Sequence, residues 1–282
     1  MPAKQVPAER PTLRVDTSMV LVPVMVSDPL NRPVNGLEKE NFRIFDNKVE
    51  QNITQFAMDD EPVAVGLVFD TSSSMGAKLR RSRMAAIEFF KLSNPEDEFF
   101  LVEFSDQAHL AVKLTSDYGD IANQLTFSKA KGSTALFDGV YLALNELRRS
   151  KKRKKALLLI SDGGDNHSRY TQKELDRIIR ESDVLIYAIG IFAGDGTMQD
   201  PWLLNRLAEQ TGARMYEADG REMPDIAKKI GIELRNRYVI GYSPTNQERD
   251  GKYHTIEVRV VPPRGLPKLR PSWRQGYFAP VD

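Results

Sequence analysis

Residues 63–75 read Val-Ala-Val-Gly-Leu-Val-Phe-Asp-Thr-Ser-Ser-Ser-Met. The apolar run, which is rich in β-branched residues, is typical of a buried strand, and it ends abruptly in an acid and a cluster of hydroxyls. The spacing Asp-x-Ser-x-Ser places Asp70, Ser72 and Ser74 at alternate positions of a tight turn, so that all three side chains can face one point. Because Mg²⁺ prefers hard oxygen ligands in octahedral geometry, these residues are candidate ligands of such an ion.

At these residues the sequence resembles the von Willebrand factor type A family, whose metal-ion-dependent adhesion site opens with this pattern. The family places a metal-binding threonine just before a helix, and Thr134 in Gly-Ser-Thr-Ala-Leu-Phe-Asp matches that position. It places its last carboxylate after another buried strand, and Asp162 in Leu-Leu-Leu-Ile-Ser-Asp-Gly matches that one. The resemblance therefore implies one divalent-metal site formed by Asp70, Ser72, Ser74, Thr134 and Asp162.

The resemblance also implies a division of roles among these five residues. Ser72, Ser74 and, in the ligand-bound state, Thr134 would contact the metal directly, whereas Asp70 and Asp162 would act largely through waters and hydrogen bonds. Neutral hydroxyls leave the charge of the cation poorly compensated, so an Asp or Glu carboxylate of a partner protein could complete the octahedron. This is a binding mechanism rather than a catalytic one. Mg²⁺ is the expected ion, although Mn²⁺ and Ca²⁺ accept the same oxygen ligands.

Composition excludes several other classes of protein. The chain has 282 residues and no cysteine, which removes disulfides, thiol catalysis and thiolate metal sites. A formal net charge of +1 gives no global attraction to nucleic acid or to an anionic membrane. No apolar run approaches the ~20 residues needed to span a bilayer, and the N-terminus lacks the pattern of a signal peptide.

Bacterial proteins that resemble this chain are commonly exported, which favours an extracytoplasmic location. The oligomeric state stays open.

Between residues 61 and 237 the apolar pattern alternates between strands and helices. The alternation predicts an α/β fold, a Rossmann-like doubly wound and mostly parallel sheet with helices on both faces. Thr171 and Glu174 form a predicted capping box at the start of one helix. The expected strands are 63–69, 98–105, 110–114, 156–160, 184–192 and 214–217, and the expected helices are 78–92, 118–125, 135–149, 171–182, 201–210 and 224–237.

The flanking segments 13–60 and 238–282 are rich in strand patterns instead. We expect strands at 19–27, 238–242, 254–261 and 269–278 and a hairpin that joins 42–45 to 49–56. Pro23 lacks a donor for a sheet ladder, so the first strand is predicted at a sheet edge. The composition predicts that both termini build one small β-sandwich into which the α/β domain is inserted, and residues 1–12 are predicted to form a disordered or flexible lead. A bacterial branch of the type A family is similar across both flanks, including segments 36–42 and 238–244.

Ligands of open parallel sheets bind outside the carboxyl ends of the strands, and Asp70 and Asp162 each follow such an end. Asp165, Asn166 and His167 follow closely and could contact the ligand or support the residues that hold the metal, although a solvated loop is the favoured interpretation. In the type A family, ligand capture is often coupled to a shift of the last helix, which is here the helix predicted at 224–237.

Each motif also has a plainer interpretation. Asp70 and its serines could form only a helix N-cap, although the matching Thr134 and Asp162 favour a metal site. The seven cations of residues 148–155 could form a nucleic-acid patch, but they are expected at the opposite pole from the metal, as a solvated helix end. The glycines of residues 190–196 lack the Gly-x-x-x-x-Gly-Lys-Ser/Thr pattern of a phosphate-binding loop.

The sequence is compatible with three functions, of which a non-enzymatic adhesion or assembly module that binds an acidic partner is favoured. The first alternative is a hydrolase in which Ser72 or Ser74 acts as a nucleophile or the metal activates water. Only His167 lies near the predicted edge as a base, and the chain has no Gly-x-Ser-x-Gly elbow. The second alternative is a scaffold in which the ion only ties the loops together.

Overall fold

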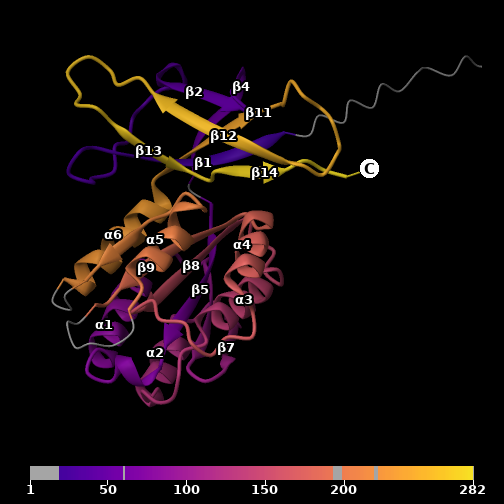
Figure 1. The fold of residues 1–282 in the computed structure, drawn as a ribbon. Helices are drawn as coiled ribbons and strands as arrows, with labels where there is room; N and C mark the ends of the chain where they lie inside the picture. Colours follow the sequence, from indigo (N-terminus) through magenta and orange to yellow (C-terminus); the bar gives the residue numbers. More distant parts are fainter. Residues whose placement is uncertain (1–18, 60, 193–198, 219–221, 282) are drawn as a thin grey trace, which may run out of the picture.

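The computed structural model describes residues 19–59, 61–192, 199–218 and 222–281, and these form an α/β domain with a β-sandwich stacked on one end (Figure 1). Within this part of the chain, the strands form one six-stranded sheet and two four-stranded sheets. The predicted lead and the glycine-rich segment 193–198 lie outside the described residues. No helix in the described ranges is both long and apolar enough for a membrane span.

The six-stranded sheet is mostly parallel, as the sequence predicted. β5 lies in its middle and pairs in parallel with β6 on one side and β8 on the other, while only β7 runs antiparallel, at an edge. All eight residues of β5 are buried, which explains its unbroken apolar sequence. In spatial order the strands are β10 (Met215–Glu217), β9 (Val184–Gly190), β8 (Lys154–Ser161), β5 (Val63–Asp70), β6 (Glu98–Phe104) and β7 (Ala108–Thr115).

Helices cover both faces of this sheet because successive residues of its strands point in opposite directions. Val65, Leu67 and Phe69 of β5 pack into one hydrophobic core, and Ala64 and Val68 pack into the other. The capping box of Thr171 and Glu174 is present at the start of α4. One face carries α1 (Leu79–Phe90), α2 (Tyr118–Phe127) and α6 (Met223–Arg235), and the other carries α3 (Leu136–Leu147), α4 (Gln172–Glu181) and α5 (Pro201–Glu209).

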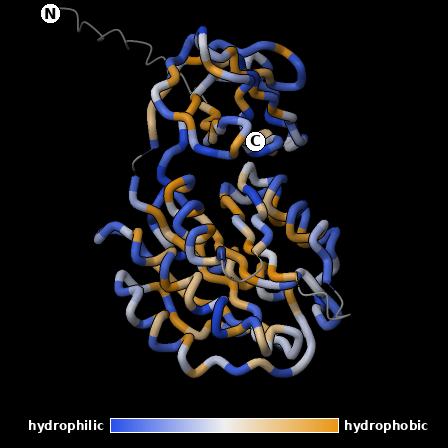
Figure 2. The backbone as a smooth tube through the Cα atoms, turned by 90° about the vertical axis from the view of Figure 1, so that its left-hand side faces the viewer, coloured by the Kyte–Doolittle hydropathy of each residue, from blue (hydrophilic) through white to orange (hydrophobic). Residues whose placement is uncertain are grey.

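The β-sandwich is built from both ends of the chain, also as predicted. In one sheet Val22 of β1 lies opposite Ile240 of β11, and in the other Ile44 of β2 lies opposite Val258 of β12. Figure 2 shows the two domains from the side, one above the other. The first sheet consists, in spatial order, of β13 (Arg270–Trp273), β1 (Val20–Ser27), β11 (Arg237–Tyr242) and β4 (Ile53–Asp59). The second sheet consists of β14 (Gly276–Phe278), β12 (Tyr253–Val260), β2 (Phe42–Asp46) and β3 (Val49–Gln51).

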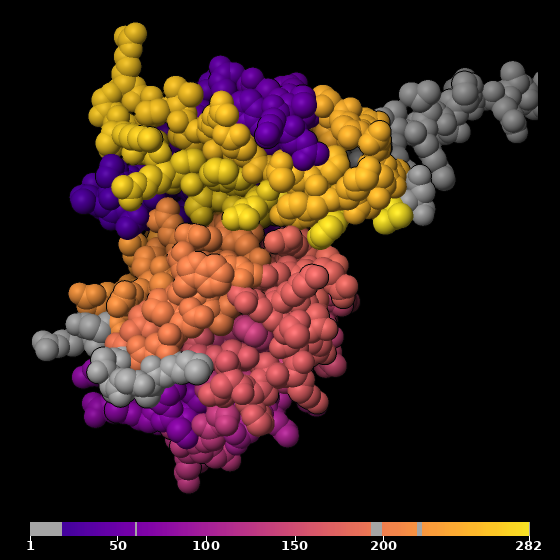
Figure 3. Space-filling view, in the orientation of Figure 1, coloured from indigo at the N-terminus to yellow at the C-terminus, as the bar shows by residue number. Residues whose placement is uncertain are grey.

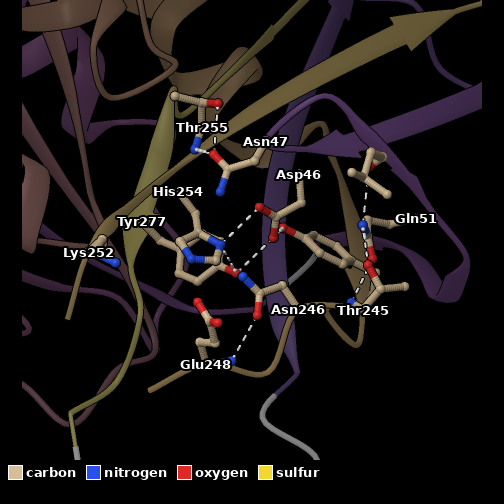
Figure 4. A network of polar contacts seen from close by, with 12 residues as sticks. Asp46, Asn47, Gln51, Thr245, Asn246, Glu248, Lys252, His254, Thr255 and Tyr277 are labelled. Carbon is tan, nitrogen blue, oxygen red and sulfur yellow. Dashed lines mark hydrogen bonds and ion pairs between the residues drawn. The ribbon is translucent and has the colours of Figure 1, made fainter. Parts of the chain in front are cut away.

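A buried carboxylate joins the two ends of the chain inside the sandwich. Asp46 accepts hydrogen bonds from the hydroxyls of Tyr242, at 3.0 Å, and Tyr277, at 2.8 Å. His254 Nδ1 lies 3.0 Å from the other oxygen of Asp46, and Figure 4 shows His254 and Tyr277 converging on it. Asp46 precedes the α/β domain and its three partners follow it, so this network holds the segments together across the insertion.

The α/β domain and the sandwich are packed against each other (Figure 3). The carbonyl of Gly212, which follows α5, accepts a hydrogen bond of 3.0 Å from Ser272 Oγ of β13. Arg274, beyond β13, forms an ion pair with Asp183, which directly precedes β9. Gly212 has a φ of +78°, and a Cβ atom there would lie 2.3 Å from the carbonyl carbon of Trp273. The absence of a side chain at Gly212 therefore sets how closely the domains approach.

Three details of the predicted flanks are wrong. β1 is not an edge strand, because it pairs with both β11 and β13. Pro23 is tolerated because β13 pairs only with Val24–Ser27, which leaves the outer side of the strand unpaired at the proline. The predicted strands 49–56 and 269–278 are each divided in two, since their halves belong to different sheets.

Candidate metal centre

The carboxyl ends of β5 and β8 lie at the same edge of the sheet, because the two strands are parallel neighbours. β5 begins near the sandwich, so this edge lies at the far end of the α/β domain (Figure 1). Asp70 is the last residue of β5, and Asp162 directly follows β8. Asp70 and Asp162, the two acids that the sequence analysis predicted in the site, thus lie at one edge of the sheet, at the end of the domain farther from the sandwich.

Asp70 is fully buried and held from two sides. One carboxylate oxygen accepts the backbone N–H of Ser72 at 2.8 Å, and the other accepts the hydroxyl of Ser161 at 2.6 Å. Burial raises the pKa of Asp70 to about 6, while the bonds from both serines oppose the rise and the nearby charge of Asp162 adds to it. Ser161 was not among the predicted site residues, although it directly precedes Asp162 in the sequence.

The raised pKa of Asp70 predicts how stability depends on pH. Between its ordinary value of 3.8 and about 6, the native protein binds more protons than the unfolded chain, so the free energy of unfolding falls as pH rises. The difference corresponds to about 3 kcal/mol. We expect the wild type to lose about 2 kcal/mol of this relative to Asp70→Asn between pH 4 and 6.5, as measured by urea denaturation in EDTA. Parallel pH profiles of the two proteins would contradict this assignment.

The two candidate serines meet directly after β5. Ser72 Oγ and Ser74 Oγ lie 3.1 Å apart, and a short 3₁₀ turn, Ser73–Met75, follows with the side chain of Met75 fully buried. The backbone N–H of Ser73 donates to the carbonyl of Gly132 at 3.1 Å. This contact brings the loop before α3, which carries the candidate threonine, alongside the serine turn.

Thr134 is clamped by the loop that follows β8. Its N–H donates to Asn166 Oδ1 at 2.9 Å, and its carbonyl accepts the N–H groups of Asn166 and His167 at 3.0 and 3.1 Å. Asp165 of the same loop accepts the N–H of Phe137 in the first turn of α3 at 3.2 Å. Residues 165–167 lie in a loop as expected, with Asn166 and His167 exposed, and they also hold the threonine loop in place. Sequence spacing alone could not reveal this, because their partners lie about 30 positions earlier.

Asp162 has a partner that the sequence analysis missed. Lys78 Nζ lies 3.1 Å from Asp162 Oδ2, and the two side chains are only 8% and 1% exposed. Asp162 Oδ1 is also buried, and it accepts no hydrogen bond from any described residue. Lys78 directly precedes α1 and stands eight positions after Asp70 in the sequence. Its position at the start of that helix is the only sequence feature that could have suggested a place near the site.

The residues at this edge fit a divalent cation. The buried Asp162 Oδ1 lacks a donor, which is the condition of a carboxylate oxygen placed for a metal or for a water bound to it. Two carboxylates and three hydroxyls are hard oxygen donors of the kind that Mg²⁺ takes. Backbone hydrogen bonds link the three loops that carry Asp70 to Ser74, Thr134 and Asp162.

Comparison with known proteins identifies the α/β domain. Residues 65–164 match the family model of the von Willebrand factor type A domain. An uncharacterized protein of Borreliella burgdorferi is 24% identical over 207 residues, which cover 62% of this chain and 60% of that relative, so the chain spans less than two thirds of it.

Two solved structures share the fold. A von Willebrand factor type A protein from Catenulispora acidiphila has a TM-score of 0.55 and 14% identity, over 86% of this chain and 73% of that one. The von Willebrand factor domain of the type V pilus tip protein Mfa5 from Porphyromonas gingivalis has a TM-score of 0.50 and 16% identity, over 64% of this chain and 98% of that one. At such identities the likeness is one of fold alone.

Proposed function

The α/β domain of this chain is a von Willebrand factor type A domain, and on that premise we propose that it binds an acidic partner protein through a divalent cation. The observation that carries the proposal is the convergence of three loops, bearing Asp70, Ser72, Ser74, Thr134 and Asp162, at one edge of the sheet. The family often mediates protein–protein interaction, which supports a binding role. A cation held there would supply a coordination position for a carboxylate oxygen of the partner.

The surroundings of the site favour a protein as the partner. The N–H of Asp200 donates to the carbonyl of Asp162 at 3.2 Å, so α5 begins beside the site. Trp202 in the first turn of that helix is 63% exposed. Exposed tryptophans are common anchors of protein interfaces, and this one would contact residues that flank the partner's carboxylate.

Binding is better supported than hydrolysis. A serine nucleophile needs a base within hydrogen-bond reach. In the described ranges, however, no histidine hydrogen-bonds to Ser72 or Ser74, whose hydroxyls contact each other. The same ranges contain no group of three or more His, Cys, Asp or Glu side chains arranged to hold a metal, so a cation at this edge would depend on the serine and threonine hydroxyls as well as on the two carboxylates.

The test is calorimetric titration of Mg²⁺ and Mn²⁺ into EDTA-treated full chain, with and without excess acetate. We expect wild type to bind either ion, acetate to strengthen the binding, and Asp70→Ala to weaken it at least about tenfold, because the variant loses the carboxylate that orients Ser72 and Ser161. Asp250→Ala, which removes an acid on the sandwich, serves as the control and should bind as wild type does.

Each outcome of this titration separates the candidate functions. Binding that ignores acetate would favour an ion that only ties the loops together. No binding by wild type would refute the metal site, and Asp70, Ser72 and Ser74 would then form only a structural turn.

A further inference from the structure

A cavity of about 410 Å³ lies at the end of the α/β domain opposite the candidate metal centre. It is bounded by the carboxyl ends of α3 and α4, which pack side by side (Figure 1), and by the segment that enters β8. Leu144, Leu147 and Ile178 line an apolar part of it, and of these three Ile178 is partly exposed, whereas the two leucines are buried. Its charged rim contains five cations, Arg148, Lys151, Lys152, Arg153 and Lys155.

The two lysines that begin β8 have different surroundings, because neighbouring residues of a strand point to opposite faces of the sheet. Lys154 and Lys155 begin β8 and point to opposite faces of the sheet. Lys154 is buried and reaches Asp59 at 2.9 Å on the face away from the cavity. Lys155 faces the cavity, is only partly exposed, and forms no ion pair with any described residue.

The rim carries more positive charge than its surroundings neutralise. In the described part of the chain, Arg148, Lys151, Lys152 and Lys155 form no ion pair, and Arg153 reaches Glu61 only at 3.9 Å between exposed side chains. The two acids that line the cavity already form ion pairs with arginines outside it: Asp183 pairs with Arg274, and Glu181 lies 3.8 Å from Arg177. These acids therefore leave the four unpaired cations uncompensated.

The helix dipoles account for only part of this excess. Each helix C-terminus carries about −0.5 of an elementary charge, so α3 and α4 together offset about one of the four cations. About three positive charges then remain around one hollow. Lys152 is half-buried as well, and keeping an unpaired cation partly out of water has a cost that an anionic ligand would remove.

We propose that this cavity binds a small phosphate-bearing molecule, with the phosphate between Lys152 and Lys155 and an apolar part against the partly exposed Ile178. Lysines hold phosphate as mobile point charges, and several around one hollow suit a multiply charged anion better than a single carboxylate. The apolar wall distinguishes the site from a solvated basic surface. The headgroup of an anionic phospholipid offers the same chemistry as a soluble organic phosphate.

The experiment is calorimetric titration of the full chain with inorganic pyrophosphate, inorganic phosphate and butyl phosphate at low salt. We expect pyrophosphate to bind, and Lys152→Glu/Lys155→Glu to weaken the binding at least about tenfold. The control is Lys113→Glu/Lys173→Glu, which makes the same change of charge at exposed positions outside the cavity. Butyl phosphate should bind more tightly than phosphate, by at most about fourfold for each methylene that the wall buries.

Two results would overturn the proposal. One is equal binding of pyrophosphate by the wild type and the Lys152→Glu/Lys155→Glu variant, including the case in which neither binds. The other is an equal loss in both double variants, which would mean that only net charge matters. Flotation with phosphatidylglycerol vesicles, against phosphatidylcholine vesicles, distinguishes the two sources of phosphate. Flotation that requires Lys152 and Lys155 and is displaced by pyrophosphate would assign the site to a lipid headgroup, and its absence would assign it to a soluble phosphate.

Discussion

Asp162→Ala is expected to destabilise the protein by about 3–5 kcal/mol in EDTA, because it leaves the ammonium of Lys78 buried without its carboxylate. The same substitution should abolish cation binding, since the orphaned oxygen of Asp162 is part of the proposed metal centre. Urea denaturation measures the first effect, and calorimetric titration of Mg²⁺ measures the second.

A double variant separates these two effects. Lys78→Met in the Asp162→Ala background removes the unpaired charge, so it should restore most of the lost stability without restoring cation binding. If Asp162→Ala alone cost less than about 1 kcal/mol, Lys78 would be solvated and the buried pair would be refuted.

Gly212→Ala is the second substitution with a large expected effect. Its φ of +78° disfavours any side chain, and its Cβ would clash with the backbone of Trp273 at 2.3 Å. We expect a loss of about 2–5 kcal/mol, from backbone strain together with overpacking. Because the clash lies between the domains, we also expect faster proteolysis at their junction. Urea denaturation and timed trypsin digestion would measure these two changes.

Gly36→Ala is a matched control for this prediction. Its φ of +80° is nearly the same, but a Cβ atom there meets nothing within 4 Å. It should therefore show only the cost of backbone strain, about 1 kcal/mol. Equal losses in both variants would mean that the domain contact at Gly212 contributes nothing.

Most of the fold follows from local sequence patterns. The apolar run of β5 and the alternation after it predict the parallel sheet, since strands buried on both faces carry unbroken apolar sequence. The prediction for Pro23 was wrong because a single residue cannot report how far a neighbouring strand extends. The strand expected at 269–278 was divided for a related reason: local propensity does not tell which sheet a residue joins.

Only those residues of the candidate site that belong to a sequence motif could be predicted. Asp70, Ser72 and Ser74 are neighbours in the sequence, and Thr134 and Asp162 were found through a family resemblance. Lys78 was not found, and the hydrogen bond between Asn166 and Thr134 was not foreseen, because both contacts form only when separate loops fold together. Whether the five residues bind a metal stays a prediction for the titration.

The central strand of the α/β domain has a mechanical consequence. β5 begins at Val63, four positions after a sandwich strand ends at Asp59, and it leads straight to Asp70 at the opposite edge. The return connection, from α6 to β11, leaves at the sandwich end as well. Tension between the sandwich and a partner held at the far edge would run along β5. The covalent backbone of β5 would carry that tension, and its parallel ladders to β6 and β8 would pass part of it to the neighbouring strands in shear, so the domain would extend little under load.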